Sequence, residues 1–246
     1  MEVLPRHQCL VYDGSPAKVL PAIAAQIKDR LNENYRCLYL NSPTMVAGMR
    51  SYLCAAGVNV RESVDKGDLI FSSEPCPMKD GQFDIQGMLD MVEHTLNLAL
   101  KDGYRGLWAT GDMTWEMGSD LNLDRLLEYE WKVEKLFERY PELSAICQYH
   151  VDTLPRDVVC HSILIHPALF INDTLARANP NYVSSDAPIQ PIIPSQELRL
   201  KVKIFAVCNR RRRKNRNGII CCSYRLLLHF LKRITALDLP VKKSSF

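Results

Sequence analysis

Hydrophobic residues follow two different spacings along the first 175 residues of the chain. Short and nearly continuous apolar runs, such as residues 9–12 and 37–40, are typical of strands buried on both faces of a parallel sheet. Between these runs apolar residues recur every three or four positions, as over residues 19–31, which is typical of amphipathic helices. This alternation predicts an α/β fold with a doubly wound, mainly parallel sheet flanked by helices.

Turn residues give the predicted elements their ends. Pro16 and Pro43 suit the first turns of helices, and Gly103 and Pro141 suit positions just beyond helix ends. Residues 57–60 are expected to form a short strand or a turn. The strands are expected at residues 9–12, 36–41, 68–72, 106–110 and 145–149, and the helices at residues 19–31, 43–53, 84–100, 121–139 and 155–164.

The polar residues that follow the predicted strands are the candidates for a binding site. Ligands of such sheets bind at the carboxyl ends of the strands, where these residues would meet. Taken singly, Asp13, Asn41 and Asp112 are most simply explained as turn and helix-cap residues. Their common place at one sheet edge nevertheless favours a pocket with aromatic and apolar walls. We expect it to be lined by Tyr12, Asp13, Asn41, Asp112, Trp115 and Tyr149.

The first strand-to-helix turn argues against nucleotide binding. It reads Asp13-Gly14-Ser15-Pro16-Ala17-Lys18, with a single glycine and no Gly-Lys-Ser/Thr, whereas a phosphate loop needs several free backbone N–H groups. A divergent nucleotide-binding ATPase is the alternative from another class, and it would need Lys18 or Ser15 on the phosphates and Asp112 on magnesium. The sequence also lacks Gly-x-Gly-x-x-Gly and Gly-x-Ser-x-Gly, which disfavours dinucleotide binding and an α/β-hydrolase.

Histidines and cysteines lie near one another at three places in the sequence. None of the three has the paired spacing of a structural zinc site, so we interpret the cysteines as buried thiols and expect no metal and no cofactor. Asp112 and Glu116 have the spacing of an acid–base pair, but no partner nucleophile is visible, so we expect no enzyme. The three places are His7 with Cys9, Cys147 with His150, and Cys160 and His161 followed by His166.

Cysteine usage and hydropathy bear on the cellular compartment. The nine cysteines are an odd number scattered through apolar stretches, which favours reduced thiols in a cytoplasmic protein. No apolar run approaches the ~18–20 residues that a membrane-spanning helix needs. The N-terminus has no signal-peptide pattern. We therefore expect a cytoplasmic location and no transmembrane segment.

The net charge of +3 hides an abrupt change of sign along the chain. Residues 1–195 carry 17 Lys/Arg and 26 Asp/Glu, whereas residues 196–246 carry 14 Lys/Arg and only Glu197 and Asp238 as acids. Such a shift usually marks a domain boundary. We expect a folded domain over residues 1–187, a proline-rich linker over 188–195 and a basic tail over 196–246.

The basic tail has three competing interpretations. It is a nucleic-acid-binding arm that contacts phosphates, a helix on an anionic membrane surface, or, after about residue 208, a disordered end that arose by frameshift or truncation. Residues 195–205 resemble the connecting helix before signalling modules such as histidine kinases, and no kinase motif follows. The nucleic-acid contacts would come from Arg210, Arg211, Arg212 and Arg213, and the membrane contacts from Leu226, Leu227, Phe230 and Ile234.

Three segments together resemble a known family. They are His7-Gln8-Cys9-Leu10-Val11-Tyr12; Gly106-Leu107-Trp108-Ala109-Thr110-Gly111-Asp112-Met113-Thr114-Trp115 followed by Leu126-Leu127-Glu128-Tyr129-Glu130; and Cys147-Gln148-Tyr149-His150 followed by His166-Pro167. In order and spacing they resemble the MEDS domain, the methanogen/methylotroph DcmR-type sensory domain, over about residues 5–183. The family often has Glu at the position of Asp112. The Asp of this chain keeps the acidic group on a shorter side chain.

The resemblance implies both a fold and a role. It implies a RecA/KaiC-like fold without an intact phosphate loop, so the ATPase alternative becomes one of KaiC type. It also implies a non-catalytic sensory domain over residues 1–187 that binds a small, largely apolar hydrocarbon derivative such as dichloromethane. The signal would pass to a transcriptional or signalling output, with a histidine kinase module as a candidate partner. A regulator that binds DNA through the basic tail is a further alternative.

Overall fold

The computed structural model describes residues 5–74, 77–80, 82–113, 123–172 and 175–184. The chain divides into two units, Met1–Ile192 and Ile193–Phe246, and all of the described residues belong to the first. Trp115, the predicted linker over residues 188–195 and the basic tail lie outside the described residues. What the sequence predicts for these residues therefore stays a prediction.

A seven-stranded sheet forms the centre of the first unit. Its strand order is β3-β2-β6-β7-β1-β8-β9, and every neighbouring pair is parallel except β8 with β9. The α/β class and the mainly parallel sheet are therefore confirmed. The strands are β1 (His7–Tyr12), β2 (Arg36–Leu40), β3 (Leu69–Ser72), β6 (Leu107–Asp112), β7 (Leu143–His150), β8 (Ala168–Asn172) and β9 (Leu175–Ala178).

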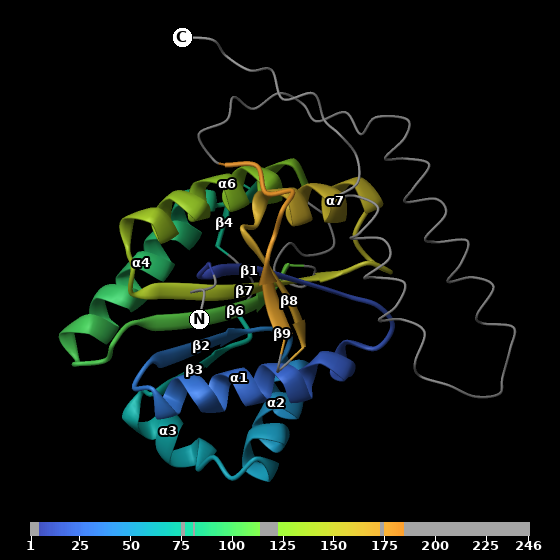
Figure 1. Cartoon of the computed structure of the whole chain (residues 1–246). Helices are drawn as coiled ribbons and strands as arrows, with labels where there is room; N and C mark the ends of the chain where they lie inside the picture. Colours follow the sequence, from blue (N-terminus) through green and yellow to red (C-terminus); the bar gives the residue numbers. More distant parts are fainter. Residues whose placement is uncertain (1–4, 75–76, 81, 114–122, 173–174, 185–246) are drawn as a thin grey trace, which may run out of the picture. The chain divides into compact units, whose positions relative to one another are not determined.

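Helices cover both faces of this sheet and make three layers (Figure 1). One face carries α1 (Leu20–Asn32), α2 (Pro43–Ala55) and α3 (Val60–Lys66), and a short 3₁₀ helix, Pro16–Val19, leads into α1. The other face carries α4 (Ile85–Lys101), α6 (Leu123–Arg139) and α7 (Arg156–Ile165). Two short antiparallel strands, β4 (Met78–Lys79) and β5 (Gln82–Phe83), form a separate ribbon before α4.

Local sequence signals explain where the helices begin. The Ser42 hydroxyl accepts a hydrogen bond from the backbone N–H of Met45, and Pro43 opens α2. The Asp84 carboxylate likewise accepts from the N–H of Gly87 at the start of α4. Side-chain oxygens at these positions satisfy N–H groups that a helix leaves unpaired in its first turn.

Two hydrophobic cores lie on the two faces of the sheet. Alternate residues of each strand point to opposite faces, so Cys9 of β1 joins the core under α4, α6 and α7, whereas Leu10 joins the core under α1, α2 and α3. The same alternation in β7 sends Cys147 and Tyr149 to the first of these cores and Ile146 to the second. β1 and β7 therefore each contribute to both cores.

Some elements differ from the sequence expectation. Residues 57–59 form no strand, so the turn is the one of the two expected alternatives that is present. Asn59 caps α3, which begins at Val60, and the hydrophobic spacing did not predict this helix because Val60 is its only buried residue. The antiparallel pair β8–β9 was also not predicted. In the part of the chain that the structure describes, no helix combines the length and the hydropathy needed to cross a bilayer.

Candidate functional site

Polar side chains meet at the carboxyl edge of the sheet, on the face covered by α1 and α2. The Tyr12 hydroxyl, at the end of β1, donates a hydrogen bond to Asp112 Oδ2 at 2.7 Å, across the intervening strand β7. In β2, which neighbours β6, Tyr39 carries a hydroxyl that accepts a hydrogen bond at 3.2 Å from the amide of Asn41, the residue directly after the strand. All four side chains are buried. We call Tyr12, Tyr39, Asn41 and Asp112 the edge cluster.

The electrostatics of the edge cluster keep its phenols neutral. Burial and the nearby Asp112 carboxylate raise the pKa of Tyr12 far above its usual value. Burial and the same carboxylate also raise the pKa of Tyr39, against the hydrogen bond from Asn41, which lowers it. The Tyr12 hydroxyl therefore stays a donor, and Asp112 has an oriented partner.

The first strand-to-helix turn is closed by contacts with the segment after β7. The backbone N–H of Gly14 donates to Asp152 Oδ2 at 2.9 Å, and His150 Nε2 donates to the Gly14 carbonyl oxygen at 2.8 Å. Gly14 has a φ of +71°, and Lys18 Nζ lies 2.7 Å from where a Cβ would stand. An N–H group that already faces a carboxylate is unsuited to an anionic phosphate.

The six predicted ligand residues therefore separate into groups. Tyr12 and Asp112 are in direct contact, and Asn41 reaches them through Tyr39, whose pKa responds to Asp112. Asp13 is exposed beside the turn, and Trp115 lies outside the described residues. Tyr149 faces the other side of the sheet, because it is the register partner of Val11 rather than of Tyr12.

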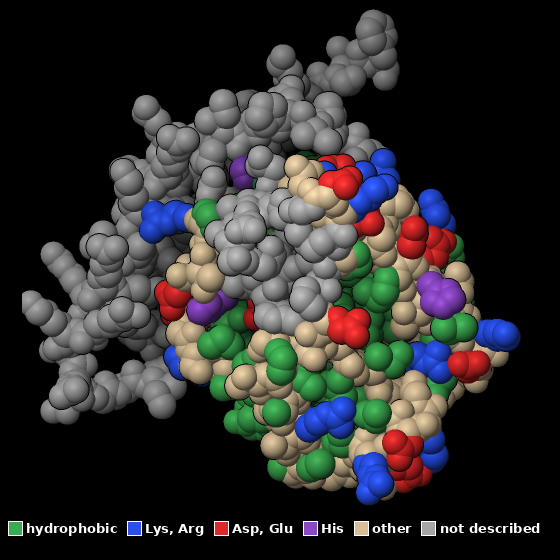
Figure 2. All heavy atoms as spheres, turned by 180° about the vertical axis from the view of Figure 1, so that it is seen from behind, with side chains coloured by type: hydrophobic (Ala, Val, Ile, Leu, Met, Phe, Trp, Pro, Cys, Tyr) green, Lys and Arg blue, Asp and Glu red, His purple; other side chains and the backbone are tan. Residues whose placement is uncertain are grey.

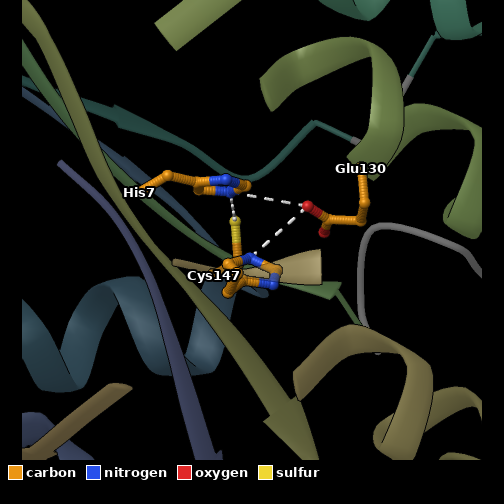
Figure 3. A group of neighbouring side chains, drawn as sticks. His7, Glu130 and Cys147 are labelled. Atoms are coloured by element: carbon orange, nitrogen blue, oxygen red, sulfur yellow. Dashed lines mark hydrogen bonds and ion pairs between the residues drawn. The ribbon is translucent and has the colours of Figure 1, made fainter. Parts of the chain in front are cut away.

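A second polar group lies on that other face, under α6 and α7. His7 of β1, Glu130 of α6, Cys147 of β7 and His166, which follows α7, all have exposed fractions of 6% or less. His7 Nε2 lies 3.4 Å from Cys147 Sγ and 3.5 Å from Glu130 Oε2. Figure 3 shows these three side chains pointing toward one another. His166 Nε2 lies 3.5 Å from the same Glu130 oxygen. We call these four residues the buried quartet.

Surrounding groups orient the histidines of the buried quartet. His7 Nδ1 donates to Glu134 Oε2 at 2.6 Å, and Glu134 Oε1 accepts from the Tyr182 hydroxyl at 3.1 Å. His166 Nδ1 donates to the Ser162 carbonyl oxygen at 2.6 Å. Carboxylate and carbonyl oxygens only accept, so both Nδ1 atoms carry protons and both Nε2 atoms face the quartet.

The carboxyl group of Glu130 is held in the same way from its other oxygen. The Tyr149 hydroxyl donates to Glu130 Oε1, which leaves Oε2 directed at His7 and His166. Tyr149, predicted as a ligand residue, is thus a neighbour of the buried quartet.

Charge in the buried quartet is shared unequally. Burial opposes the charged form of His7, yet Glu130 and Glu134 outweigh it and raise the pKa of His7 to about 9. Burial, together with the nearby His7, lowers the pKa of His166 to about 4. Burial alone would raise the pKa of Glu130, but His166, His7 and Tyr149 leave it lowered. At neutral pH the quartet without a bound ion therefore holds a carboxylate, one imidazolium and one neutral imidazole.

The sequence suggested groups of cysteines and histidines that are close along the chain, and the fold brings together a different set. It grouped His7 with Cys9 and Cys147 with His150, whereas the fold groups His7, Cys147 and His166 with Glu130. One local signal existed: Glu130 and Glu134 interrupt the apolar stripe of α6, and both are buried. Two acids one turn apart on a core-facing stripe indicate partners from elsewhere in the chain.

The outer surface adds little to either cluster. A hollow of about 490 Å³ lies between α1 and α2, and none of the predicted ligand residues lines it. On the face seen in Figure 2, acidic and basic side chains of the described part are interspersed, and neither sign forms an extended patch. The hollow is lined by Pro21, Ala24, Ala25, Lys28, Asp29, Tyr52, Ala55 and Ala56.

Comparison with known protein families gives a match over most of the described domain. A family model described as MEDS, the MEthanogen/methylotroph, DcmR Sensory domain, matches residues 6–167. A search of curated proteins gave no match. The matched range contains both the edge cluster and the buried quartet, and it does not include the basic tail.

Proposed function

The chain belongs to the MEDS family of sensory domains, and from this premise we propose that it binds a small hydrocarbon-type molecule without chemically changing it. Binding would be relayed to a transcriptional or signalling output in the cytoplasm. The RecA/KaiC kinship implied by the sequence is part of this proposal. The mostly parallel sheet supports the RecA/KaiC-like fold. The single glycine in the first strand-to-helix turn fits a member of that fold without an intact phosphate loop.

The contact between Tyr12 and Asp112 is the observation that carries the proposed binding site. These side chains come from two strands that are not neighbours, and they meet at the carboxyl edge, where such sheets bind ligands. A neutral phenol and an oriented carboxylate offer a few polar groups beside an aromatic wall, the usual composition of small-molecule sites. Asn41 lies beside them, and we include Asp13 and Trp115 at the rim because each follows the end of a strand.

The same edge disfavours the KaiC-type ATPase. The backbone N–H of Gly14 already faces the Asp152 carboxylate, and Asp112 Oδ2 accepts from Tyr12 rather than standing open to magnesium. Adding a triphosphate would place its negative charge against both carboxylates. Nucleotide binding is therefore the outcome that would overturn the proposal.

The relay requires the ligand to bind two arrangements of the domain with different affinities. The turn at Gly14 is a suitable element, because His150 and Asp152 tie it to the end of β7 beside Tyr12, whose ring stacks on His150 at 4.9 Å. The output partner would be a histidine kinase module, or nucleic acid bound through Arg210, Arg211, Arg212 and Arg213.

The first experiment is a thermal-shift measurement on the full chain with chlorinated methanes and other one-carbon compounds in one arm and magnesium-ATP in the other. A ligand at about 100 times its dissociation constant stabilises the folded state by about 2.7 kcal/mol. We expect a shift with a small apolar compound that is lost in Tyr12→Phe and Asp112→Asn. The control Tyr52→Phe changes an exposed tyrosine of α2 and should keep the shift. A shift with magnesium-ATP alone would overturn the sensor proposal.

A further inference from the structure

We propose that the buried quartet of His7, Glu130, Cys147 and His166 is a closed binding site for one divalent transition-metal ion of the zinc class. The site lies on the opposite face of the sheet from the edge cluster and does not depend on the proposed ligand. It also departs from the sequence expectation, which favoured buried thiols and no metal.

The separations of the donor atoms fit tetrahedral coordination. With metal–ligand bonds of about 2.0–2.3 Å, tetrahedral geometry places neighbouring donor atoms about 3.3–3.6 Å apart. His7 Nε2 and Cys147 Sγ lie 3.4 Å apart, and Glu130 Oε2 lies 3.5 Å from the Nε2 atoms of both His7 and His166. All four donor atoms lie within 4.8 Å of one another. Three of the six donor pairs already have the tetrahedral separation, and drawing the remaining pairs in from at most 4.8 Å completes the tetrahedron.

The outer hydrogen bonds aim the lone pairs inward. A histidine that binds a metal through one ring nitrogen commonly donates a hydrogen bond from the N–H of the other to a carboxylate or a backbone carbonyl. Here His7 Nδ1 donates to Glu134, and His166 Nδ1 donates to the Ser162 carbonyl oxygen. Tyr149 holds the second oxygen of Glu130. Three of the four ligands are therefore pre-oriented by groups that would not contact the metal.

Two atoms of the quartet lack a hydrogen-bond partner among the described residues. They are Glu130 Oε2 and His166 Nε2, both buried and only 3.5 Å apart. Because His166 Nδ1 carries the ring proton, a neutral His166 directs a lone pair at a carboxylate oxygen, which is unfavourable in an interior. A cation between them removes the repulsion. A proton shared within the quartet is the competing explanation.

The chemistry of the donors selects the class of metal. Two imidazoles, one thiolate and one carboxylate form the mixed set that suits zinc, whereas magnesium and calcium prefer oxygen ligands alone. Four protein donors leave no coordination position for water, which is the pattern of structural rather than catalytic sites. The bound ion would join β1, β7 and α6 to the junction between α7 and β8.

Binding must release protons, because the ligands have to be deprotonated. The Cys147 thiol loses its proton as Sγ bonds to the metal, and His7 loses the proton of its imidazolium at Nε2. Both protons pass to the buffer, and no oxidation or reduction takes place. The heat of binding should therefore depend on the ionisation enthalpy of the buffer.

Cobalt titration of the full chain, previously stripped with a chelator, is the test. We expect about one Co²⁺ per chain, with a thiolate-to-cobalt charge-transfer band and strong tetrahedral d–d bands that zinc abolishes. Cys147→Ser should lose the charge-transfer band, and Glu134→Gln should weaken zinc binding about 10–100-fold. Cys54→Ser and His94→Gln change exposed residues of the same types and should bind as the wild type does.

X-ray absorption on the zinc-loaded wild type keeps the test decisive even if Cys147→Ser fails to fold. The proposal expects one sulfur and three nitrogen or oxygen neighbours around the zinc. A folded wild type that takes up no stoichiometric metal, a zinc ion without a sulfur neighbour, or a charge-transfer band that survives in a folded Cys147→Ser would each overturn it. The buried quartet would then be a proton-sharing network.

Discussion

The edge cluster and the buried quartet are both buried but differ in how their polar atoms are paired. In the edge cluster, Tyr12 donates to Asp112 and Asn41 donates to Tyr39. In the buried quartet, Glu130 Oε2 and His166 Nε2 have no hydrogen-bond partner among the described residues. Burial alone therefore does not identify the chemistry of a polar group. An internally paired cluster at a sheet edge suits an exchanging ligand, whereas interior lone pairs that lie close together without a hydrogen bond suit a retained cation.

Removing Glu130 should produce the largest effect. Glu130→Ala leaves His7 and His166 without the carboxylate between them, and breaking a buried charge pair costs about 3–5 kcal/mol. Glu128→Ala, on the same helix, removes only a surface pair with Lys132 and should change stability by less than about 1 kcal/mol. Urea denaturation measures both. Equal losses in the two variants would contradict the distinction between the quartet and the surface.

The pH dependence of the metal-free chain should come from the quartet rather than the edge cluster. His7 has an ordinary pKa of 6.5 and a folded pKa of about 9. A raised folded pKa contributes stability that is fully present below about pH 6.5 and is lost as the pH rises through about 9. His7 faces Glu130 and Glu134 of α6, the Cys147 thiol and His166.

The measurement is the free energy of unfolding across pH 6.5–9, in the presence of a chelator. Wild-type stability should fall across this range, and Tyr12→Phe should show the same fall. His7→Gln removes the imidazole and should lose most of this fall, while the buried thiols of Cys9 and Cys37, whose pKa values burial raises, keep a smaller decrease near pH 9. A fall that persists unchanged in His7→Gln would assign the dependence to another group.

Breaking the Tyr12–Asp112 contact should have a moderate effect. Tyr12→Phe leaves the buried Asp112 carboxylate without this donor, which costs about 1–3 kcal/mol. Tyr52→Phe, at an exposed position of α2, should be close to neutral. Thermal unfolding compares the two variants. Cobalt binding by Tyr12→Phe should equal that of the wild type, because the two clusters lie on opposite faces.

The smallest effect concerns the turn beside the edge cluster. Gly14→Ala places a Cβ at a φ of +71°, which costs about 1–2 kcal/mol, and the Cβ also displaces the flexible end of Lys18. Gly57→Ala has a φ of +84° with open space around the Cβ, so it isolates the backbone cost. We expect the two variants to agree within about 0.5 kcal/mol in denaturation. A much larger loss in Gly14→Ala would show that Lys18 holds the turn.

Much of the fold was predictable because its signals are local. The apolar run before Asp13 and the helical spacing after Pro16 each depend on neighbouring residues, and they gave the strand, the turn and α1 in that order. The short helix α3 was missed because a seven-residue element with a single buried residue carries too little periodicity. The strand β9 was missed because its role depends on pairing with β8.

The sequence by itself determined the α/β class, and it brought Tyr12 and Asp112 to one edge, because carboxyl ends of parallel strands converge whatever the strand order. Only the tertiary structure decided the buried quartet. The register that pairs Cys9 with Cys147 sets His7 beside Cys147 from 140 positions away, and the packing of α6 brings Glu130 to them. The local spacing of hydrophobic residues indicates which face of a strand or helix a residue lies on. Strand order and register, which come from long-range pairing, decide which residues share that face.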